Sequence, residues 1–405
     1  MNRRELLKTL GYSSIAGAGG LHGLSFSAQA NNTLVFVFLR GGADSLHMAA
    51  PVEDPNYIAA RPPELRILNT GNTPGLALPQ SFAPNQDCRI HPAAAPLLDL
   101  FQSEHAQLLH ACGLANATRS HFVAQEILES SVSGANDRLL STTNGWLQTY
   151  AAPKVADAKA SAKTIRYVGT NSAQIRSLQG LSSGLSISGE LRNSLSWPGD
   201  AMGKSVLEAL YANPAVTPAD PVLTLGQETL QQLTLLDSKM PRVDGRIAPY
   251  RPPQGVKYNT ENYDWLQATQ TVAQLIRMDV GLQMACLDFG GWDTHEYQSG
   301  KINNLIRQWS GNLRALFDDM KAAGKNMTLV VVSEFGRRLR ANASGGTDHG
   351  HAGALWLLDT QGRKWLPATQ WPGLATQQLD QGLDLQHSHD VKKMLGLIAQ
   401  KTLLS

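Results

Sequence analysis

Histidine and aspartate residues cluster in short glycine-rich stretches of this chain, in patterns that metal sites use. The densest stretch is Gly346-Thr-Asp-His-Gly-His351, which holds two imidazoles and one carboxylate. Imidazole and carboxylate groups together suit a divalent metal ion, and glycine lets the backbone turn so that neighbouring side chains converge. Asp293-x-His295 adds a second pair and Glu334 a further oxygen. An isolated pair is also common in a solvated loop or at a helix cap, but here the pairs recur.

The pattern therefore predicts a site for a divalent ion, with Zn²⁺, Mn²⁺, Mg²⁺ and Ca²⁺ as the candidates. The residues expected to bind the metal, or to support its ligands, are Asp44, Asp293, His295, Glu334, Asp348, His349 and His351.

Ser120 stands between Arg119 and His121, at the expected start of a helix over 120–129. The N-terminus of a helix exposes N–H groups and the positive end of the helix dipole, both of which favour an anion. Ser120 is therefore a candidate nucleophile, with Arg119 and His121 as its catalytic neighbours. The alternative is that Ser120 only caps the helix, and the two roles are compatible.

Three arginines could bind an oxyanion, because a guanidinium donates a fork of two parallel hydrogen bonds. For each of them the alternative is an ordinary structural ion pair. The three are Arg40, Arg119 and Arg337.

The candidate groups follow or precede short apolar runs that are typical of buried strands. The run 33–39 is continuous, rich in β-branched and aromatic residues, and bounded by Arg40-Gly-Gly42, which predicts a buried parallel strand. Further strands are expected at 107–112, 164–168, 282–288, 327–333 and 354–358. Sites in open α/β sheets form beyond the carboxyl ends of the strands, so we expect the candidate groups to meet at that edge.

Segments with helical spacing separate these strands. Helices are expected at 91–102, 120–129, 202–213, 227–239, 260–280, 301–323 and 388–401. Strands alternating with helices predict an α/β fold, a doubly wound and mostly parallel sheet flanked by helices. The region 150–260 is richer in Ser, Gly, Asn and Pro, and we expect it to be an inserted cap region, with an exposed loop at 240–255.

The composition excludes several classes of protein. Apolar residues make up 42% and charged residues 17% of the 405 residues, which is not the composition of a disordered chain. Lys+Arg 35 nearly balances Asp+Glu 33, so no basic excess exists to neutralise nucleic-acid phosphates. No apolar run reaches the length of an ordinary membrane span. Three cysteines do not make a disulfide scaffold, and Cys112 and Cys286 lie in apolar runs, where we expect buried strand residues.

The first thirty residues have the features of an export signal. Arg3 and Arg4 precede a mildly apolar stretch, and Ala28-Gln-Ala30 is a small-x-small cleavage signature. The paired arginines favour the twin-arginine route, which carries folded proteins and so permits metal loading before export. We expect a twin-arginine signal peptide at 1–30, recognition by the twin-arginine translocase, and a mature domain at 31–405 in the periplasm. The alternative is a basic amphipathic helix.

Several blocks resemble the twin-arginine-exported family of unknown function numbered 1501, over nearly the whole mature chain. These blocks are Phe38-Leu-Arg-Gly-Gly-Ala-Asp44, His91-Pro92, His110-Ala-Cys-Gly113, Thr118-Arg-Ser-His-Phe122 with Gln125, Gly290-Gly-Trp-Asp-Thr-His295, Val332-Ser-Glu-Phe-Gly-Arg337 and Gly346-Thr-Asp-His-Gly-His351. The family is similar to the alkaline phosphatase and sulfatase superfamily. That similarity implies the alkaline phosphatase-like α/β fold, a Ser, Thr or modified Cys nucleophile at a helix start, and one or two metals at the strand ends.

The resemblance can be carried over to particular residues. Ser120 matches the nucleophile block, and Asp293-x-His295 resembles the superfamily's Asp–x–x–x–His metal pair with a spacing two residues shorter. Either His349 or His351 matches the single histidine that precedes a late strand. Two positions depart from the superfamily pattern, because Arg40-Gly41-Gly42 and Ser333-Glu334-Phe335 replace an Asp and an Asp-His pair.

Two functions are compatible with these features. The first is an exported metal-dependent hydrolase that cleaves a small phosphate or sulfate ester with a serine nucleophile. The alternative is a non-catalytic periplasmic binding or assembly protein on the same fold. The dense Asp/His loop favours the hydrolase, whereas the departures from the superfamily pattern favour the binding protein.

Overall fold

The computed structural model describes residues 32–71, 74–79, 87–131, 144–151, 164–171, 175–181, 184–195, 200–211 and 221–403. The expected signal peptide at 1–30 lies outside these residues. Among the helices of the described ranges, each is too short or too polar to cross a membrane.

An eight-stranded sheet forms the centre of the fold, in the order β15-β5-β14-β11-β1-β10-β6-β7. The apolar run at 33–39 is its central strand, β1, and every residue of that strand is buried. A continuous apolar run forms such a strand because both of its faces must be covered. The strands are β1 (Thr33–Leu39), β5 (Ala106–Gly113), β6 (Tyr167–Gly169), β7 (Gly184–Ser186), β10 (Met284–Phe289), β11 (Met327–Val332), β14 (Gly353–Asp359) and β15 (His389–Asp390).

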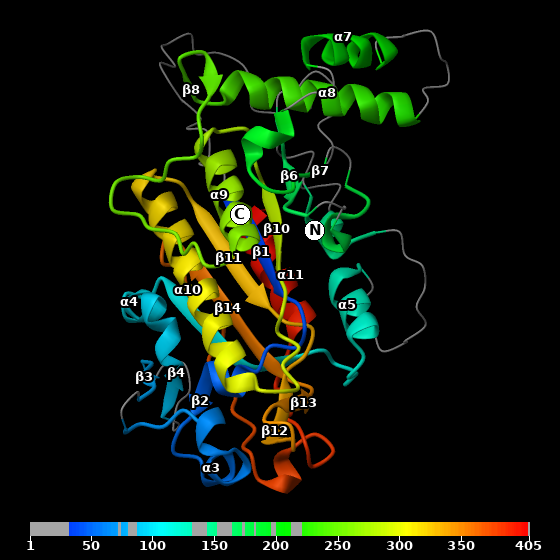
Figure 1. The fold of residues 1–405 in the computed structure, drawn as a ribbon. Helices are drawn as coiled ribbons and strands as arrows, with labels where there is room; N and C mark the ends of the chain where they lie inside the picture. The colour runs from blue at the N-terminus through cyan, green and yellow to red at the C-terminus, as the bar shows by residue number, and fades with distance from the viewer. Residues whose placement is uncertain are drawn as a thin grey trace, which may run out of the picture. The chain divides into compact units, whose positions relative to one another are not determined.

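Helices cover both faces of this sheet, so the doubly wound α/β prediction is confirmed. Alternate residues of β1 enter two different cores: Val35 and Val37 pack with the helices α9 and α10, and Phe36 and Phe38 pack with α5 and α11. Figure 1 shows α9 and α10 in front of the sheet and α11 behind it. The helices are α5 (His121–Glu129), α9 (Tyr263–Arg277), α10 (Gln298–Ala322) and α11 (Val391–Leu403).

One strand runs against the others. β14 is antiparallel to both of its neighbours, β11 and β5, whereas the remaining pairs of the sheet are parallel. The start of β14 therefore lies at the edge where β1, β10 and β11 end. This direction brings the loop before β14, with its Asp and His residues, to the carboxyl edge of the parallel strands.

The segment 91–102 differs from the single helix that the apolar spacing predicts. It is a 3₁₀ helix over Pro92–Leu97, followed by the short helix α4 (Leu98–Gln102). Pro96 lies inside the first part, and a proline there has no N–H to donate and clashes with the preceding turn of an α-helix.

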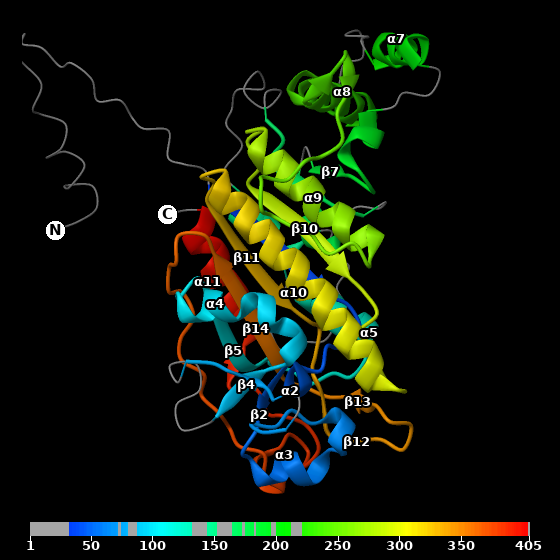
Figure 2. The same ribbon diagram turned by 60° about the vertical axis from the view of Figure 1, so that its left-hand side comes forward.

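The expected insertion at 150–260 is partly sheet. β6 and β7 fall within that range and belong to the main sheet. The helices α7 (Asp200–Tyr211) and α8 (Pro221–Lys239) and the hairpin of β8 (Arg242–Val243) and β9 (Arg246–Ile247) lie outside it. Met240, just after α8, is in contact with Gln274 near the end of α9. The end of α9 in turn leads into the start of β10. This packing is at the amino edge of the sheet, as Figure 2 also shows, away from the candidate residues.

Short elements complete the carboxyl edge. β12 (Arg337–Ala341) and β13 (Thr347–His349) form an antiparallel hairpin, and β2 (Ala49–Pro51), β4 (Cys88–Ile90) and β3 (Leu76–Ala77) form a small sheet. The remaining elements are helices α2 (Ser45–Met48) and α3 (Pro55–Ala60) and 3₁₀ helices at Pro63–Leu65, Trp146–Tyr150, Arg176–Leu178, Leu191–Leu195 and Thr376–Gln378.

Cys88, Cys112 and Cys286 are buried free thiols, and the last two lie in strands as expected.

Candidate metal centre

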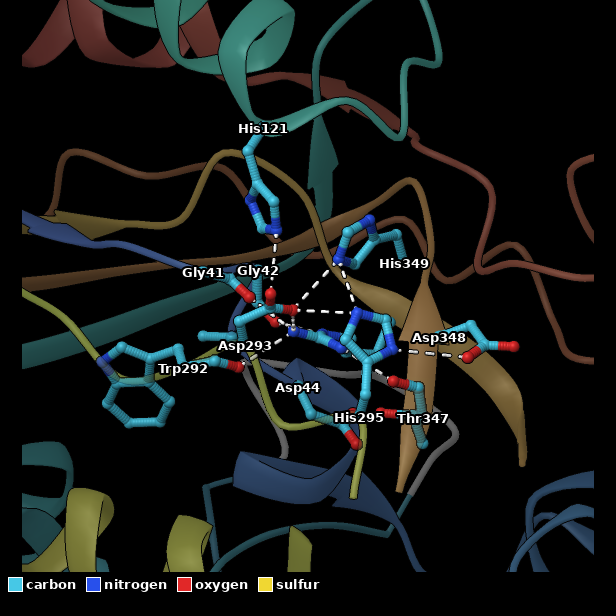
Figure 3. A network of polar contacts seen from close by, with 12 residues as sticks. Gly41, Gly42, Asp44, His121, Trp292, Asp293, His295, Thr347, Asp348 and His349 are labelled. Atoms are coloured by element: carbon cyan, nitrogen blue, oxygen red, sulfur yellow. Dashed lines mark hydrogen bonds and ion pairs between the residues drawn. The ribbon is translucent and has the colours of Figure 1, made fainter. Parts of the chain in front are cut away.

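Three side chains from distant parts of the chain meet at the carboxyl edge of the sheet. His121 is the first residue of α5, Asp293 follows β10, and His349 ends β13. One nitrogen or oxygen atom of each lies within 4.8 Å of the other two (Figure 3). Three loops that follow or precede different strands thus converge at one place.

The hydrogen bond made by one ring nitrogen of His349 determines whether the other ring nitrogen carries a proton. Nδ1 lies 2.8 Å from the backbone oxygen of Arg119; a carbonyl oxygen only accepts, so Nδ1 carries the proton. Burial lowers the pKa of His349, which keeps the ring neutral near pH 7. Nε2 therefore presents a lone pair, and it lies 3.0 Å from Oδ1 of Asp293.

His121 is held in the same way from the other side. Its Nδ1 lies 2.8 Å from a carboxylate oxygen of Glu334, and the carboxylate accepts a hydrogen bond from the Nδ1–H. Its Nε2 is buried, has no hydrogen-bond partner, and lies 3.4 Å from Oδ2 of Asp293. With its proton on Nδ1, each neutral imidazole thus directs a lone pair at one of the two oxygens of the Asp293 carboxylate.

His295 extends this group of acceptors. Its Nε2 lies 2.9 Å from Nε2 of His349 and 3.0 Å from Oδ1 of Asp293, while its Nδ1 is 3.4 Å from Oδ1 of Asp348. Asn342 donates to the same Asp348 oxygen at 3.1 Å. Acceptor atoms that face one another at such distances repel unless a cation or a proton lies between them. The donor set of imidazole nitrogens and one carboxylate fits a divalent metal, with zinc the best match to its chemistry.

Arg337 fixes the carboxylate of Asp293. The buried guanidinium donates to Oδ1 of Asp293 at 2.7 Å, and to the backbone oxygens of Gly42 at 2.6 Å and Thr347 at 2.7 Å. Partial burial alone would raise the pKa of Asp293, but the hydrogen bond and the charge of Arg337 lower it below its ordinary value. Asp293 is therefore ionised, as a metal ligand must be.

Glu334 supports the centre from behind rather than as a direct ligand. Its buried carboxylate accepts hydrogen bonds from the Gly41 N–H at 2.9 Å, from Gln125 at 2.8 Å and from Ser333 at 3.0 Å, in addition to that of His121. A carboxylate bonded to the distal nitrogen of a metal-binding histidine fixes its tautomer and its orientation.

Glu334→Gln is expected to weaken divalent metal binding about 10- to 100-fold, because the amide no longer holds His121 with a charged acceptor. Chelator competition on the purified protein measures this affinity. Glu296→Gln is the matched control, since it removes an exposed carboxylate next to His295 in the chain. An equal loss in both variants would show that only the local negative charge matters.

Close backbone contacts hold the loops together. A Cβ on Gly41, whose φ is 122°, would lie 2.4 Å from the backbone nitrogen of Asp293, and one on Gly346 would lie 2.3 Å from the backbone oxygen of His295. Both distances are shorter than any side chain allows. The two glycines are therefore required for the loops to approach each other.

Asp44, predicted as a ligand, is occupied elsewhere. Its carboxylate forms two hydrogen bonds with Arg61, at 2.7 and 2.9 Å, and accepts a third from Gln298 at 2.6 Å. Both side chains of the ion pair are completely buried. Asp44 is a structural residue here, and the ligand prediction for it is wrong because this arginine, 17 positions further along the chain, takes both oxygens.

His351 and Arg119 also point away from the centre. His351 donates from Nε2 to the Leu114 oxygen at 2.7 Å, with its ring 4.8 Å from that of His387. The Arg119 guanidinium binds Asp384, with Nε 2.9 Å from Oδ2, so its contribution to the centre is the backbone oxygen that holds His349.

The two other arginines proposed for oxyanion binding have internal partners. Arg337 is buried and donates to Asp293 and to the backbone oxygens of Gly42 and Thr347, as described above. Arg40 binds Glu129 at 3.0 and 3.1 Å and Asp288 at 2.7 Å. Both are structural ion pairs.

Ser120 occupies the N-cap position of α5, but its side chain makes no capping hydrogen bond and is exposed. It lies in sequence between the carbonyl group that holds His349 and the ring of His121. Ser120 is thus the chain neighbour of His121, and its hydroxyl is not engaged by the helix end.

Tyr297, two residues after His295, has a left-handed backbone conformation with φ 48° and ψ 43°. Its N–H donates to the Ser344 oxygen at 3.1 Å, and the N–H of Gln298 donates to the Gly345 oxygen at 3.0 Å. A residue other than glycine loses about 1–2 kcal/mol in this conformation, so these contacts hold Tyr297 against its preference.

No sequence pattern pointed to the residues that support the centre through hydrogen bonds. Arg61, Gln298 and Asn342 stand in unremarkable polar contexts, and only the fold shows that they bind Asp44 and Asp348. Gln125 is the exception, because it belongs to a block that resembles the family and follows His121 by one helical turn, so it faces the same side.

Comparison with known proteins identifies the family. The model described as "Protein of unknown function (DUF1501)" matches residues 31–362, and the chain belongs to this family. None of the curated proteins matches the chain.

Solved structures similar to this chain include the C-terminal periplasmic domain of EcEptC from Escherichia coli, with a TM-score of 0.40 and 9% identity, covering 93% of this chain and 83% of that one. Its zinc complex has a TM-score of 0.37 and 9% identity, covering 84% and 78%. Alkaline phosphatase from the Antarctic bacterium TAB5 has a TM-score of 0.36 and 9% identity, covering 92% and 98%. Likenesses at these scores carry no information about the site or its chemistry.

Proposed function

We propose that this member of the DUF1501 family is an exported, metal-dependent hydrolase of phosphate or sulfate esters, with Ser120 as its nucleophile. The observation that carries the proposal is the pair of imidazole lone pairs, from His121 and His349, directed at the two oxygens of Asp293. Such a set of acceptors is stable only with a cation or a proton between its members, and its imidazole and carboxylate groups suit a divalent metal.

The proposed metal ligands are His121, Asp293 and His349, with His295 beside them. Imidazole nitrogens favour Zn²⁺ over Mg²⁺ and Ca²⁺, which prefer oxygen ligands. A divalent ion bound there supplies a Lewis acid that polarises a non-bridging oxygen of the ester. Arg337 keeps the carboxylate of Asp293 ionised and fixed, and Glu334 keeps the proton of His121 on Nδ1.

Ser120 would supply the attacking oxygen. Its Oγ forms a bond to the phosphorus or sulfur of the ester, the bond from that atom to the alcohol oxygen breaks, and the alcohol leaves with a proton. The hydroxyl proton of Ser120 passes to solvent, which reaches this exposed side chain. Water then releases phosphate or sulfate from Ser120.

Ser120→Ala is expected to lower turnover of aryl phosphate or aryl sulfate about 1000-fold or more, because it removes the nucleophile. Bound metal and melting temperature should stay nearly unchanged, since the side chain makes no capping bond. Steady-state kinetics, metal analysis and thermal unfolding on the same sample measure all three. Ser131→Ala, in an exposed serine just beyond the other end of α5, is the matched control.

Two results would count against this function. Full activity of Ser120→Ala would leave Ser120 as a residue at the helix end only. No hydrolysis of either ester by the wild-type protein with Zn²⁺, Mn²⁺, Mg²⁺ or Ca²⁺ would favour the alternative, a binding or assembly protein.

The export route is a separate part of the proposal. The motif Arg3-Arg4 with Ala28-Gln-Ala30 supports a twin-arginine signal and a mature chain in the periplasm. Replacing both arginines by lysine is expected to leave the uncleaved precursor in the cytoplasm, as cell fractionation and immunoblotting would show. Normal export of that variant would argue for another route.

A further inference from the structure

The backbone oxygen that holds His349 in its tautomer belongs to a residue that is itself anchored by its side chain. The backbone oxygen of Arg119 lies 2.8 Å from Nδ1 of His349. The guanidinium of the same residue donates to Oδ2 of Asp384, from Nε at 2.9 Å and also from Nη2. The Asp384 side chain is completely buried, whereas that of Arg119 is 26% exposed. A buried carboxylate thus holds the residue that supports the centre.

The other oxygen of Asp384 faces the hairpin that carries His349. Among the described residues, Oδ1 of Asp384 has no hydrogen-bond partner, and it lies 3.9 Å from Nε of Arg338 in β12. Asp384 also forms an antiparallel backbone bridge with Arg338. Arg337, which precedes it in β12, is paired with His349 across the hairpin. Asp384 therefore contacts both the segment that provides the acceptor and the strand beside the donor.

The pair of Asp384 and Arg119 is suited to hold a backbone segment in place. A buried carboxylate is strongly disfavoured without a charged partner, and hydrogen bonds between charged groups are short and strong. Burial raises the pKa of Asp384, and the hydrogen bond and the charge of Arg119 oppose this rise. The other two partners of the guanidinium are more distant, with Gln381 at 3.3 Å and Asp380 at 3.9 Å. Asp384 is therefore the main anchor of the Arg119 side chain.

We propose that Asp384 is a positioning residue of the metal centre. By holding Arg119, it keeps the Arg119 carbonyl group where it accepts the Nδ1–H of His349, and so leaves Nε2 of His349 free for the metal. The inference rests on the metal site of the proposed function and is independent of the ester. Asp384 lies beyond residues 31–362, the part that the family model matches, so membership of the family does not assign this role.

Asp384→Asn is expected to weaken Zn²⁺ binding about tenfold, at the lower end of the range for supporting residues, because it acts through one further residue. Chelator competition on the purified protein measures this. Asp359→Asn is the matched control: Asp359 is also completely buried and pairs with an arginine, Arg363, at 2.8 Å and 29% exposure. Asp359 pairs with Thr328 at the start of β11, the edge of the sheet away from the centre. Asp359→Asn should therefore lose stability but keep its affinity for Zn²⁺.

The double variant Arg119→Gln with Asp384→Asn separates positioning from stability. It leaves neither member of the pair charged without its partner, so it should regain melting temperature relative to Asp384→Asn. Its affinity for Zn²⁺ should stay low, because the Arg119 carbonyl group is still not anchored. If the affinity recovers together with the melting temperature, Asp384 is only structural and the inference is overturned. If Asp384→Asn does not fold, the double variant is compared with the wild-type protein directly.

Histidine ¹⁵N NMR of the metal-free protein gives a readout that does not depend on stability, since it reports which ring nitrogen carries the proton. We expect His349 to be protonated at Nδ1 in the wild-type protein, and the proton to be shared between Nδ1 and Nε2 in Asp384→Asn.

The inference and the proposed function can fail separately. Unchanged Zn²⁺ affinity in Asp384→Asn would overturn the inference even if the protein is a good hydrolase. Weaker Zn²⁺ binding in Asp384→Asn, together with no ester hydrolysis by the wild-type protein, would support the inference and remove the proposed function.

Discussion

Replacing His349 by alanine is expected to lower the affinity for divalent metal at least 100-fold, whereas His351→Ala leaves the metal content unchanged. The two histidines are two residues apart, but only His349 directs a free Nε2 at Asp293, at 3.0 Å. The Nε2–H of His351 donates a hydrogen bond to the Leu114 oxygen at 2.7 Å, so His351 lies outside the group. Losing a direct ligand should cost more than the 10- to 100-fold typical of supporting residues.

Metal analysis of both variants, purified side by side, and chelator competition give the result. His351→Ala should lose stability instead, by about 1–3 kcal/mol, because it leaves a buried carbonyl oxygen without its donor. The assignment fails if His351→Ala releases the metal and His349→Ala retains it.

Arg61→Met is expected to destabilise the fold by about 3–5 kcal/mol, because it leaves Asp44 charged and without its partner in the interior. Both side chains of this pair are completely buried. Burial would raise the pKa of Asp44, but the charge and hydrogen bonds of Arg61 lower it below its ordinary value. Removing Arg61 therefore removes the group that keeps Asp44 ionised.

Urea unfolding monitored by fluorescence measures the loss. Arg307→Met is the matched control, since its pair with Glu261 is exposed, at 44% for each side chain, and should cost under about 1 kcal/mol. The double variant Arg61→Met with Asp44→Asn should lose less than Arg61→Met alone, because no charge is left buried. Equal losses for Arg61→Met and Arg307→Met would contradict the assignment of Asp44 to the structural core.

The sheet could be predicted largely from the sequence, because its central strands are continuous apolar runs. Thr33–Leu39 forms β1 as expected, and the other runs form β5, β10, β11 and β14 within a few residues. The sequence does not indicate that β14 is antiparallel, since a strand buried on both faces has the same composition in either direction. That direction decides whether the loop with Asp348 and His349 reaches the other loops.

The individual ligands could not be separated by pattern alone. Asp44 and Asp293 both follow a strand, but only the fold shows that Arg61 takes the oxygens of the first. His349 and His351 share one glycine-rich loop, and their roles depend on which carbonyl oxygen lies near each ring. His121 was expected to assist catalysis, and the tertiary contact with Glu334 instead directs its Nε2 at Asp293.

The order of strands in the main sheet has a consequence for synthesis on the ribosome. β1 emerges first, but it pairs only with β10 and β11. Among the neighbouring pairs of this sheet, only β6–β7 and β11–β14 join strands that are consecutive in it along the chain. At about 5–20 residues per second, the roughly 240 residues between β1 and β10 take some tens of seconds to appear. The central strand, two residues after the proposed signal peptide, must wait uncovered for that time. A chain of this topology is thus exposed to chaperones and to aggregation until nearly all of it has been made, and any translocase that accepts only folded cargo would have to act after termination.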